Sequence, residues 1–229
     1  GVHLTINGRD EKALAETAQA IEKLSGHAPH IVKADVSTKE GQQALLKACP
    51  DPDILVNNNG GPPPKNFRAI DRQAMLEGVV QNMVTPIELV QAVIETMIAR
   101  KFGRIINITS SSVRTPLQDL DLSSGARAGL TGFLAGVARE VAPHNVTINA
   151  ILPGMFDTDR IKSMVSKQSQ NRNVTEQTVL NERLATIPAG RLGTAEEFGK
   201  MCAFLASNHA GFITGQNILM DGGAFRSSY

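Results

Sequence analysis

The sequence is poor in the residues that would announce a metal or disulfide centre. It has no tryptophan, one tyrosine and two cysteines in 229 residues. Cys49 and Cys202 lie far apart, which excludes a disulfide framework and a zinc knuckle and fits a reducing compartment. The five histidines share no helical ligand spacing, so no metal site is predicted.

An excess of charge and long apolar runs are also missing. The net charge is +1, from 23 basic and 22 acidic side chains that are scattered along the chain. Without a cluster of Lys and Arg, no nucleic-acid partner and no membrane surface is predicted. No apolar run approaches the length of a membrane span and the N-terminus has no signal-peptide pattern, so we expect a soluble, cytoplasmic protein.

What the sequence does contain is a regular alternation of strand and helix patterns. A chain of this length with 41% apolar residues can bury one core, so a single domain spanning 1–229 is expected. Short, β-branched segments are typical of strands buried on both faces of a parallel sheet. These segments are 2–6, 30–36, 53–58, 104–110, 146–152 and 217–222.

Helical periods separate these segments. Apolar residues recur with helical spacing in 11–24, 82–99 and 128–142. Ser37 with Glu40 and Thr194 with Glu197 have the spacing of capping boxes that begin two further helices. The alternation predicts an α/β fold, a Rossmann-type, doubly wound parallel sheet in one domain.

One polar stretch, around 161–185, interrupts the alternation after a predicted strand. A lid that covers a binding site is one interpretation of it. A solvated helix-loop insertion without a function is the other, and the sequence leaves both open.

Ligands of such sheets bind beyond the carboxyl ends of the strands. At the first strand end, Gly8 leaves space and Arg9 offers a guanidinium that can grip a 2′-phosphate, which favours NADP over NAD. An exposed arginine beside a helix start is the simpler alternative. At the next strand end, Asp35 can accept a hydrogen bond from an adenine amino group, with Val36 beside it. Its alternative is an ordinary helix N-cap neighbourhood.

The third strand end carries "NNNG". Asn57 and Asn58 offer side-chain amides there, and Gly60 permits a close approach of the backbone to a ligand. We therefore predict that these three residues bind the cofactor.

Several segments together resemble the short-chain dehydrogenase/reductase family, in its 3-oxoacyl-carrier-protein-reductase-like branch. They are "LVNNNGG", "QNM", "GRIINITSSS", "RAGLTGFLAGVAREVAPHNVTINAILPGMFDTDR" and "ITGQNILMDGG". Their order and spacing, from residue 1 to about residue 224, carry the resemblance. It implies hydride transfer between nicotinamide and a small-molecule carbonyl or alcohol, 3-oxoacyl-like among the options, and a homotetramer or homodimer.

The chain departs from the family pattern at its start. Family members open with a strand, a glycine-rich turn and a helix, whereas this sequence begins just before the segment that resembles the family's second strand. We expect the first strand and the phosphate loop not to be represented. Because that strand would lie in the middle of the sheet, its absence should leave two unpaired strand edges.

The second departure is in the active-site pattern. Ser110 matches the family's serine, which polarises the substrate carbonyl, and Asn82 matches an asparagine of its proton path. Where a tyrosine and a lysine would follow, the chain has Ser123 and Arg127, and its one tyrosine is Tyr229. The chain resembles a divergent branch of the family with Ser-x-x-x-Arg and "NNNGGPPP".

The Ser123–Arg127 pair keeps part of the expected chemistry. A serine hydroxyl is too weak an acid to replace the phenol, but a fixed positive charge can hold the nicotinamide ribose and stabilise an alkoxide. The alternatives are a helix N-cap for Ser123 and, for Arg127, a buried ion pair with Asp119 or Asp121.

A Pro-Gly turn follows the fifth predicted strand. It resembles the family's turn that holds the nicotinamide carboxamide, which assigns cofactor contacts to Pro153, Gly154, Phe156 and Thr158. The sequence thus predicts an NADP(H)-dependent oxidoreductase with an atypical active site. A non-catalytic NADP-binding sensor or scaffold is the alternative, and a lyase or isomerase activity on the same fold is a third.

Overall fold

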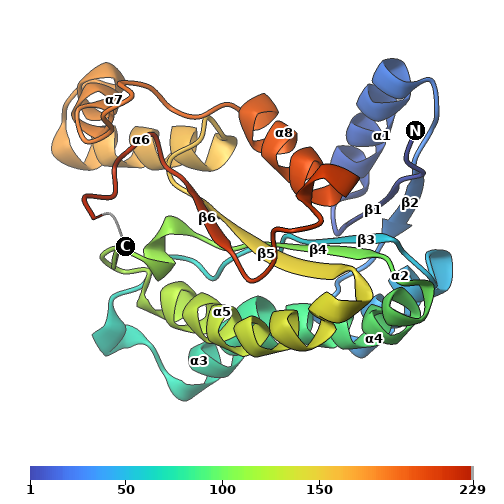
Figure 1. The fold of residues 1–229 in the computed structure, drawn as a ribbon. Coiled ribbons are helices and arrows are strands. Elements are labelled where there is room, and N and C mark those ends of the chain that lie inside the picture. The colour runs from blue at the N-terminus through green and yellow to red at the C-terminus, as the bar shows by residue number, and fades with distance from the viewer. Residues whose placement is uncertain (228–229) are drawn as a thin grey trace.

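The computed structural model describes residues 1–227 as a single α/β domain (Figure 1); Tyr229 lies outside the described residues. The strands are β1 (Thr5–Gly8), β2 (His30–Lys33), β3 (Ile54–Asn57), β4 (Gly103–Ile108), β5 (Val146–Pro153) and β6 (Asn217–Met220). The α-helices are α1 (Glu11–Ser25), α2 (Lys39–Ala48), α3 (Arg72–Val79), α4 (Thr85–Arg100), α5 (Asp121–Val141), α6 (Asp159–Arg172), α7 (Glu176–Leu184) and α8 (Ala195–Ala206).

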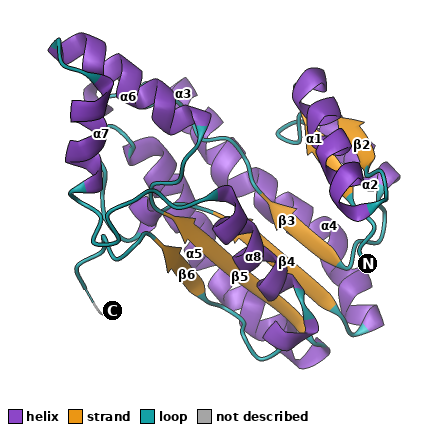
Figure 2. Ribbon diagram, turned by 90° about the horizontal axis from the view of Figure 1, so that it is seen from above, coloured by secondary structure: helices purple, strands orange, loops and turns teal. Residues whose placement is uncertain are grey.

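All strand pairs in the described chain are parallel, but they form two sheets. The larger sheet has the order β3-β4-β5-β6, and β1 pairs only with β2. Figure 2 shows the small sheet beside the larger one, so that β1 and β3 each end a sheet. The sheet is therefore divided between β1 and β3, where the family resemblance places the first strand.

The predicted burial of the strands is confirmed only in the middle of the larger sheet. β4 and β5 are buried along nearly their whole length, whereas β1 and β6 are half-buried and β2 is largely exposed. In β3, the Val56 side chain is 44% exposed. The prediction of burial on both faces was wrong for these strands because they lie at the edges of the two sheets.

Helices cover both faces of the larger sheet. α4 and α5 lie on one face and α8 on the other (Figure 1). Val93, Met97 and Leu134 belong to the core on the α4–α5 side, and Leu205 packs with Ile106 and Ile151 on the α8 side. Within the described residues, no helix is both long and apolar enough to cross a membrane.

The two predicted capping boxes had different outcomes. Thr194 and Glu197 form one at the start of α8, as predicted. The prediction for Ser37 was wrong, because its hydroxyl donates to Asp35 Oδ1 over 2.6 Å and Thr38 is the N-cap of α2. Ser37 and Thr38 both have hydroxyl groups that can cap a helix, and the local turn decides which of them caps α2.

The helix that carries Ser123 begins earlier than predicted. α5 starts at Asp121 rather than at 128, and its N-cap is Leu120, without a side-chain cap hydrogen bond. Ser123 therefore lies inside the helix, and the N-cap alternative for Ser123 was wrong. The predicted helix 82–99 is likewise part of a longer helical run, in which a π-helical turn, Val80–Val84, joins α3 to α4.

The polar stretch 161–185 is a helical hairpin. α6 ends at Asn173 in a left-handed conformation, and α7 follows it. Val165 and Val179 are buried, so each helix contributes an apolar side chain to the fold. The segment is thus an ordered helical insertion, and its action as a lid stays a prediction.

Two glycines let the long helical run approach α5 closely. A Cβ atom on Gly78 would lie 2.6 Å from Leu122 Cγ, and one on Gly129 would lie 2.8 Å from Met83 Sδ. Distances this short leave no room for a methyl group. This close packing brings the π-helical turn with Asn82 next to the start of α5.

Gly78→Ala should lower the free energy of unfolding by about 1–3 kcal/mol, because the added methyl group overpacks the contact with Leu122. In a Leu122→Ala background the same substitution should be tolerated. Gly132→Ala is the matched control on α5, where nothing lies within 4 Å of an added Cβ. Denaturant unfolding measures all variants, and equal losses in both backgrounds would contradict the packing explanation.

Candidate active site

Three of the predicted active-site residues, Asn82, Ser123 and Arg127, come together where the carboxyl ends of β3 and β4 meet the start of α5. Arg127 is at the centre, with only 8% of its surface exposed. Its Nη1 donates to the Ile108 carbonyl at the end of β4 over 2.7 Å, and its Nη2 donates to the Asn59 carbonyl just after β3 over 3.1 Å. One side chain therefore fastens α5 to two neighbouring strand ends.

The acceptors of this buried guanidinium are all neutral. Besides the two carbonyls, Arg127 Nε donates to Ser123 Oγ over 3.2 Å. The ion-pair alternative was wrong, because none of the ion pairs within residues 1–227 involves Arg127. Loss of solvation, followed by the positive charge of Arg160, lowers the pKa of Arg127 to about 10. Arg127 is thus still a cation at neutral pH.

Ser123 links Arg127 to Asn82. Its hydroxyl accepts from Arg127 and donates to Asn82 Oδ1 over 3.2 Å. Asn82 is buried on the π-helical turn and donates from Nδ2 to the Gly60 carbonyl over 2.9 Å. π-Helical turns inside α-helices are frequent at functional sites. The hydroxyl proton of Ser123 is directed at an amide oxygen of the protein.

Ser110 lies two residues beyond the carbonyl that Arg127 binds. Its hydroxyl accepts from the Ser112 amide over 3.1 Å and begins a short 3-10 helix, Ser111–Val113. Ser110 is half-buried at the end of β4. The hydroxyl oxygen is therefore engaged locally, while its proton is available to an acceptor such as a carbonyl oxygen.

The "NNNG" residues divide between the core and the surface. Asn57 is buried, and its Nδ2 donates to Asn107 Oδ1 and to the Pro86 carbonyl. The prediction of a cofactor contact through its side chain was wrong, because that amide joins neighbouring strands. Asn58 and Gly60 are exposed, and nothing lies within 4 Å of a Cβ built on Gly60.

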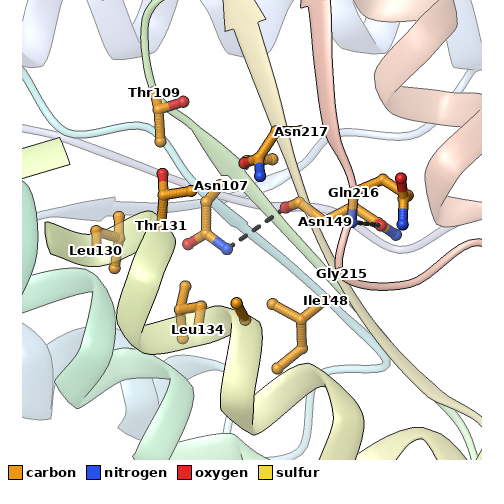
Figure 3. A pocket seen from close by; sticks show the side chains of 12 residues that line it. Asn107, Thr109, Leu130, Thr131, Leu134, Ile148, Asn149, Gly215, Gln216 and Asn217 are labelled. Atoms are coloured by element: carbon orange, nitrogen blue, oxygen red, sulfur yellow. Dashed lines mark hydrogen bonds between the residues drawn. The ribbon is translucent and has the colours of Figure 1, made fainter. Parts of the chain in front are cut away.

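Asn57 is the first member of a series of asparagines on three neighbouring strands. Asn107 on β4 donates to the Asn149 carbonyl on β5, and Asn149 binds backbone groups of Ile213 and Gln216. Figure 3 shows Asn107 and Asn149 beside a cavity of about 20 Å³, a volume that fits one water molecule. This asparagine series lies within the sheet and contains no active-site side chain.

Arg9 and Asp35 meet at the end of the small sheet. Arg9 Nη1 lies 3.6 Å from Asp35 Oδ2, and the Arg9 side chain is 74% exposed. Hydrogen bonds from the Ser37 hydroxyl and amide, and then the charge of Arg9, lower the pKa of Asp35. The Val36 carbonyl accepts from Gln42. The two predicted adenosine-side residues Arg9 and Asp35 are thus adjacent.

The Pro-Gly turn packs the Phe156 side chain against the fold and leaves Thr158 exposed. The Gly154 amide donates to the Met220 carbonyl, which continues the pairing of Pro153 with Met220. The Phe156 ring meets Phe198 edge to face, with centroids 5.2 Å apart, and Thr158 is the N-cap of α6. The cofactor contacts of Phe156 and Thr158 stay predictions.

A second cavity lies under this turn. It measures about 280 Å³ and is lined by residues that include Met155, Phe156, Arg191, Glu197 and Asp221. Arg191 and Glu197 pair with each other across two hydrogen bonds. Asp221, the remaining charged residue named in the lining, accepts hydrogen bonds from the Gly223 and Phe225 amides.

Several residues of the site were not predicted from the sequence as functional. Asn59 donates to the Gln81 carbonyl and supplies the carbonyl for Arg127, and the Ile108 carbonyl is equally important. Every residue has a main-chain carbonyl, so residue type does not indicate which carbonyl will accept a hydrogen bond. Gly61 and Asp119 had a detectable signal, since each lies in a turn-rich segment next to an active-site motif.

A family model described as enoyl-(acyl carrier protein) reductase matches residues 1–224. The chain belongs to the short-chain dehydrogenase/reductase family. Its sheet order and the position of Ser110 at the end of β4 agree with that membership, while Ser123 and Arg127 depart from the family pattern.

Relatives within this family are 30–35% identical to the chain. The NADPH-dependent reductase BacG of Bacillus subtilis is 31% identical over 229 residues, which cover 98% of this chain and 88% of BacG. The 3-oxoacyl-[acyl-carrier-protein] reductase FabG of Haemophilus influenzae is 32% identical over 214 residues, 92% of this chain and 84% of FabG.

Solved structures agree with this membership. YwfH, an NADPH-dependent reductase involved in bacilysin biosynthesis, superposes with a TM-score of 0.90 at 30% identity, over 98% of this chain and 89% of YwfH. L-Sorbose reductase from Gluconobacter frateurii, complexed with NADPH and L-sorbose, has a TM-score of 0.93, with 99% of this chain and 88% of the reductase covered. At 24% identity the second likeness shows the fold alone.

Ser123→Ala should lower the free energy of unfolding by about 1–3 kcal/mol, because it leaves Arg127 Nε and Asn82 Oδ1 without their partner. Ser124→Ala is the matched control, since the Ser124 hydroxyl is buried without a hydrogen-bond partner within residues 1–227. Its removal should be neutral or stabilising. Denaturant unfolding distinguishes the two, and equal effects would show that the Ser123 bridge contributes nothing.

Proposed function

We propose that the chain is an NADP(H)-dependent oxidoreductase that transfers hydride between the nicotinamide and a small-molecule carbonyl or alcohol. The observation that carries the proposal is the buried cation of Arg127, bonded to Ser123 and to the strand-end carbonyls of Ile108 and Asn59. A buried cation with neutral partners at this edge of the sheet suits a reaction in which negative charge develops. The reductase relatives support the same chemistry.

The residues present fit an NADP molecule. Gly60 leaves open space at the end of β3, and Arg9 presents an exposed guanidinium at the end of β1. A guanidinium has five donors, and Arg127 spends three of them on the protein, so two can reach ribose hydroxyls. Arg9 would hold the 2′-phosphate, Asp35 the adenine, and the backbone of the Pro153–Thr158 turn the carboxamide.

When bound, the cofactor supplies or accepts the hydride. The chain's own residues then handle the charge and the proton. Ser110 would donate a hydrogen bond to the substrate oxygen, and Arg127 would stabilise the developing alkoxide by its charge. Ser123 orients Arg127 and Asn82, because its proton is directed at Asn82. A water molecule is the proposed source of the final proton.

One observation favours a second candidate function. Ser123 stands at the family's tyrosine position, and its hydroxyl proton is donated to Asn82 Oδ1. A protein that binds NADP as a sensor or scaffold, without turnover, would need no proton donor at that position. Binding of NADPH without oxidation in the presence of carbonyl compounds would favour this candidate.

Assembly and location are further parts of the proposal. We propose a homotetramer or homodimer in the cytoplasm, with α4 and α5 at one subunit contact and β6 at another. Phe133 on α5 and Phe204 on α8 support this, since both are large apolar side chains more than 40% exposed. We also propose that the α6–α7 hairpin covers the substrate as a lid.

Arg9→Ala should weaken NADPH binding by roughly 1.5–3 kcal/mol and leave NADH binding nearly unchanged, because only NADPH carries the 2′-phosphate. Fluorescence titration of both cofactors measures this. Lys12→Ala is the control, since Lys12 is a nearby exposed cation on α1 that pairs with Glu16. An equal loss for both cofactors would contradict the assignment of Arg9.

Arg127→Met should reduce turnover of a carbonyl panel with NADPH by about 10²–10³-fold, the effect of removing one donor from an oxyanion site. Arg127→Lys, which keeps the charge, should retain part of the activity. Thermal unfolding of both variants controls for misfolding, and turnover is compared at saturating NADPH because the loss of Arg127 should also weaken cofactor binding. Turnover that survives Arg127→Met in a folded protein would refute the proposed role.

A further inference from the structure

The segment Gly60–Asn66, with the sequence GGPPPKN, is fastened at both ends. Asn82 Nδ2 donates to the Gly60 carbonyl over 2.9 Å at its start. At its other end, the Lys65 amide donates to the Asp119 carbonyl over 2.9 Å, and Asn66 Nδ2 lies 3.5 Å from Asp119 Oδ1. This segment, which we call the strap, thus runs from the end of β3 to the residues just before α5.

The strap passes directly over the active-site side chains. A Cβ atom built on Gly61 would lie 3.3 Å from Ser123 Oγ, 3.7 Å from Asn82 Oδ1 and 3.8 Å from Arg127 Nη2. An added methyl group would be in ordinary contact with Asn82 and Arg127, and the Ser123 hydroxyl would have to shift by a few tenths of an ångström. The strap is therefore seated on the Ser123–Arg127 pair.

The composition of the strap makes it stiff. Pro62, Pro63 and Pro64 have fixed φ angles and no amide hydrogen, so the middle of the strap has little conformational freedom. At the far end, Asp119 adopts a left-handed conformation with φ of 61°, in which its carbonyl and its carboxylate both meet the strap. Asp and Asn tolerate that conformation better than most residues do.

We infer that the strap is a fixed wall over Ser123 and Arg127, and that Asp119 is the positioning residue that holds it. The wall limits the carbonyl substrate to one with a small substituent on that side. This substrate limit rests on the proposed function, whereas the clamp between Asp119 and the strap does not. Gly61 also lies next to the Ser123 hydroxyl. A tyrosine at position 123 with its ring on that side would therefore clash with Gly61.

Hydrogen exchange tests the clamp without any substrate. The prolines have no amide hydrogen, so Gly60, Gly61, Lys65 and Asn66 report on the strap. Asp119→Gly keeps the positive φ and the carbonyl that accepts from the Lys65 amide, but it removes the carboxylate that Asn66 contacts. The loosened clamp should speed exchange of the Lys65 amide by about 2-fold, the low end of what one hydrogen bond contributes. Asp119→Asn keeps an acceptor oxygen and should exchange like the wild type.

Substrate selectivity tests the wall. Lys65→Pro removes the amide that binds Asp119, and Lys65→Ala keeps it, so the two variants differ at the clamp. We expect Lys65→Pro to raise kcat/KM for a branched ketone relative to that for acetoacetate ester by about tenfold, with NADPH affinity unchanged within about twofold. Lys65→Ala should keep the wild-type ratio.

The outcomes separate the inference from the proposed function. Unprotected exchange of the Lys65 amide in the wild type would overturn the clamp. An unchanged selectivity ratio in Lys65→Pro would overturn the wall. If the wild type turns over no carbonyl, the proposed function fails and the substrate limit with it, while hydrogen exchange still decides the clamp.

Discussion

The site depends on one buried guanidinium held by neutral groups. Arg127 joins α5 to the ends of β3 and β4, and its partners carry no negative charge. Burying a cation this way is unfavourable unless its hydrogen bonds are satisfied, so the surrounding carbonyls must be in place for the protein to fold around it. The same requirement leaves the positive charge unneutralised at the strand ends, where a developing alkoxide would be stabilised.

The helices set the geometry that this interaction needs. Gly78 and Gly129 let the Asn82-bearing helix come close to α5, and the π-helical turn aims Asn82 at Ser123 and Gly60. Replacing a phenol by a serine would otherwise open a gap at this point. Here the gap is filled by the main chain of the strap, so the small residue at 123 and the glycine at 61 complement each other.

Much of the fold could be predicted from the sequence, because strands and helices leave periodic patterns of apolar residues. The clustering of Ser123, Arg127 and Asn82 also followed from spacing and family resemblance. The contacts of Arg127 could not be predicted, since main-chain carbonyls have no sequence signature. The start of α5 was placed too late because no capping side chain marks it, and Asn57 was assigned to the cofactor because an amide suits a ligand as well as a neighbouring strand.

The asparagine series in the sheet has a consequence for strand alignment. Apolar strands such as β3 and β4 can slide past one another with little change in the area that they bury. The hydrogen bond from Asn57 to Asn107 forms only in the observed alignment, in which the two residues are direct partners. A shift by one residue would move Asn57 to the opposite face and leave the Asn107 acceptor buried and unpaired. These amides thus fix the register of β3 and β4. That register sets the relative positions of the Asn59 and Ile108 carbonyls, which both accept hydrogen bonds from Arg127.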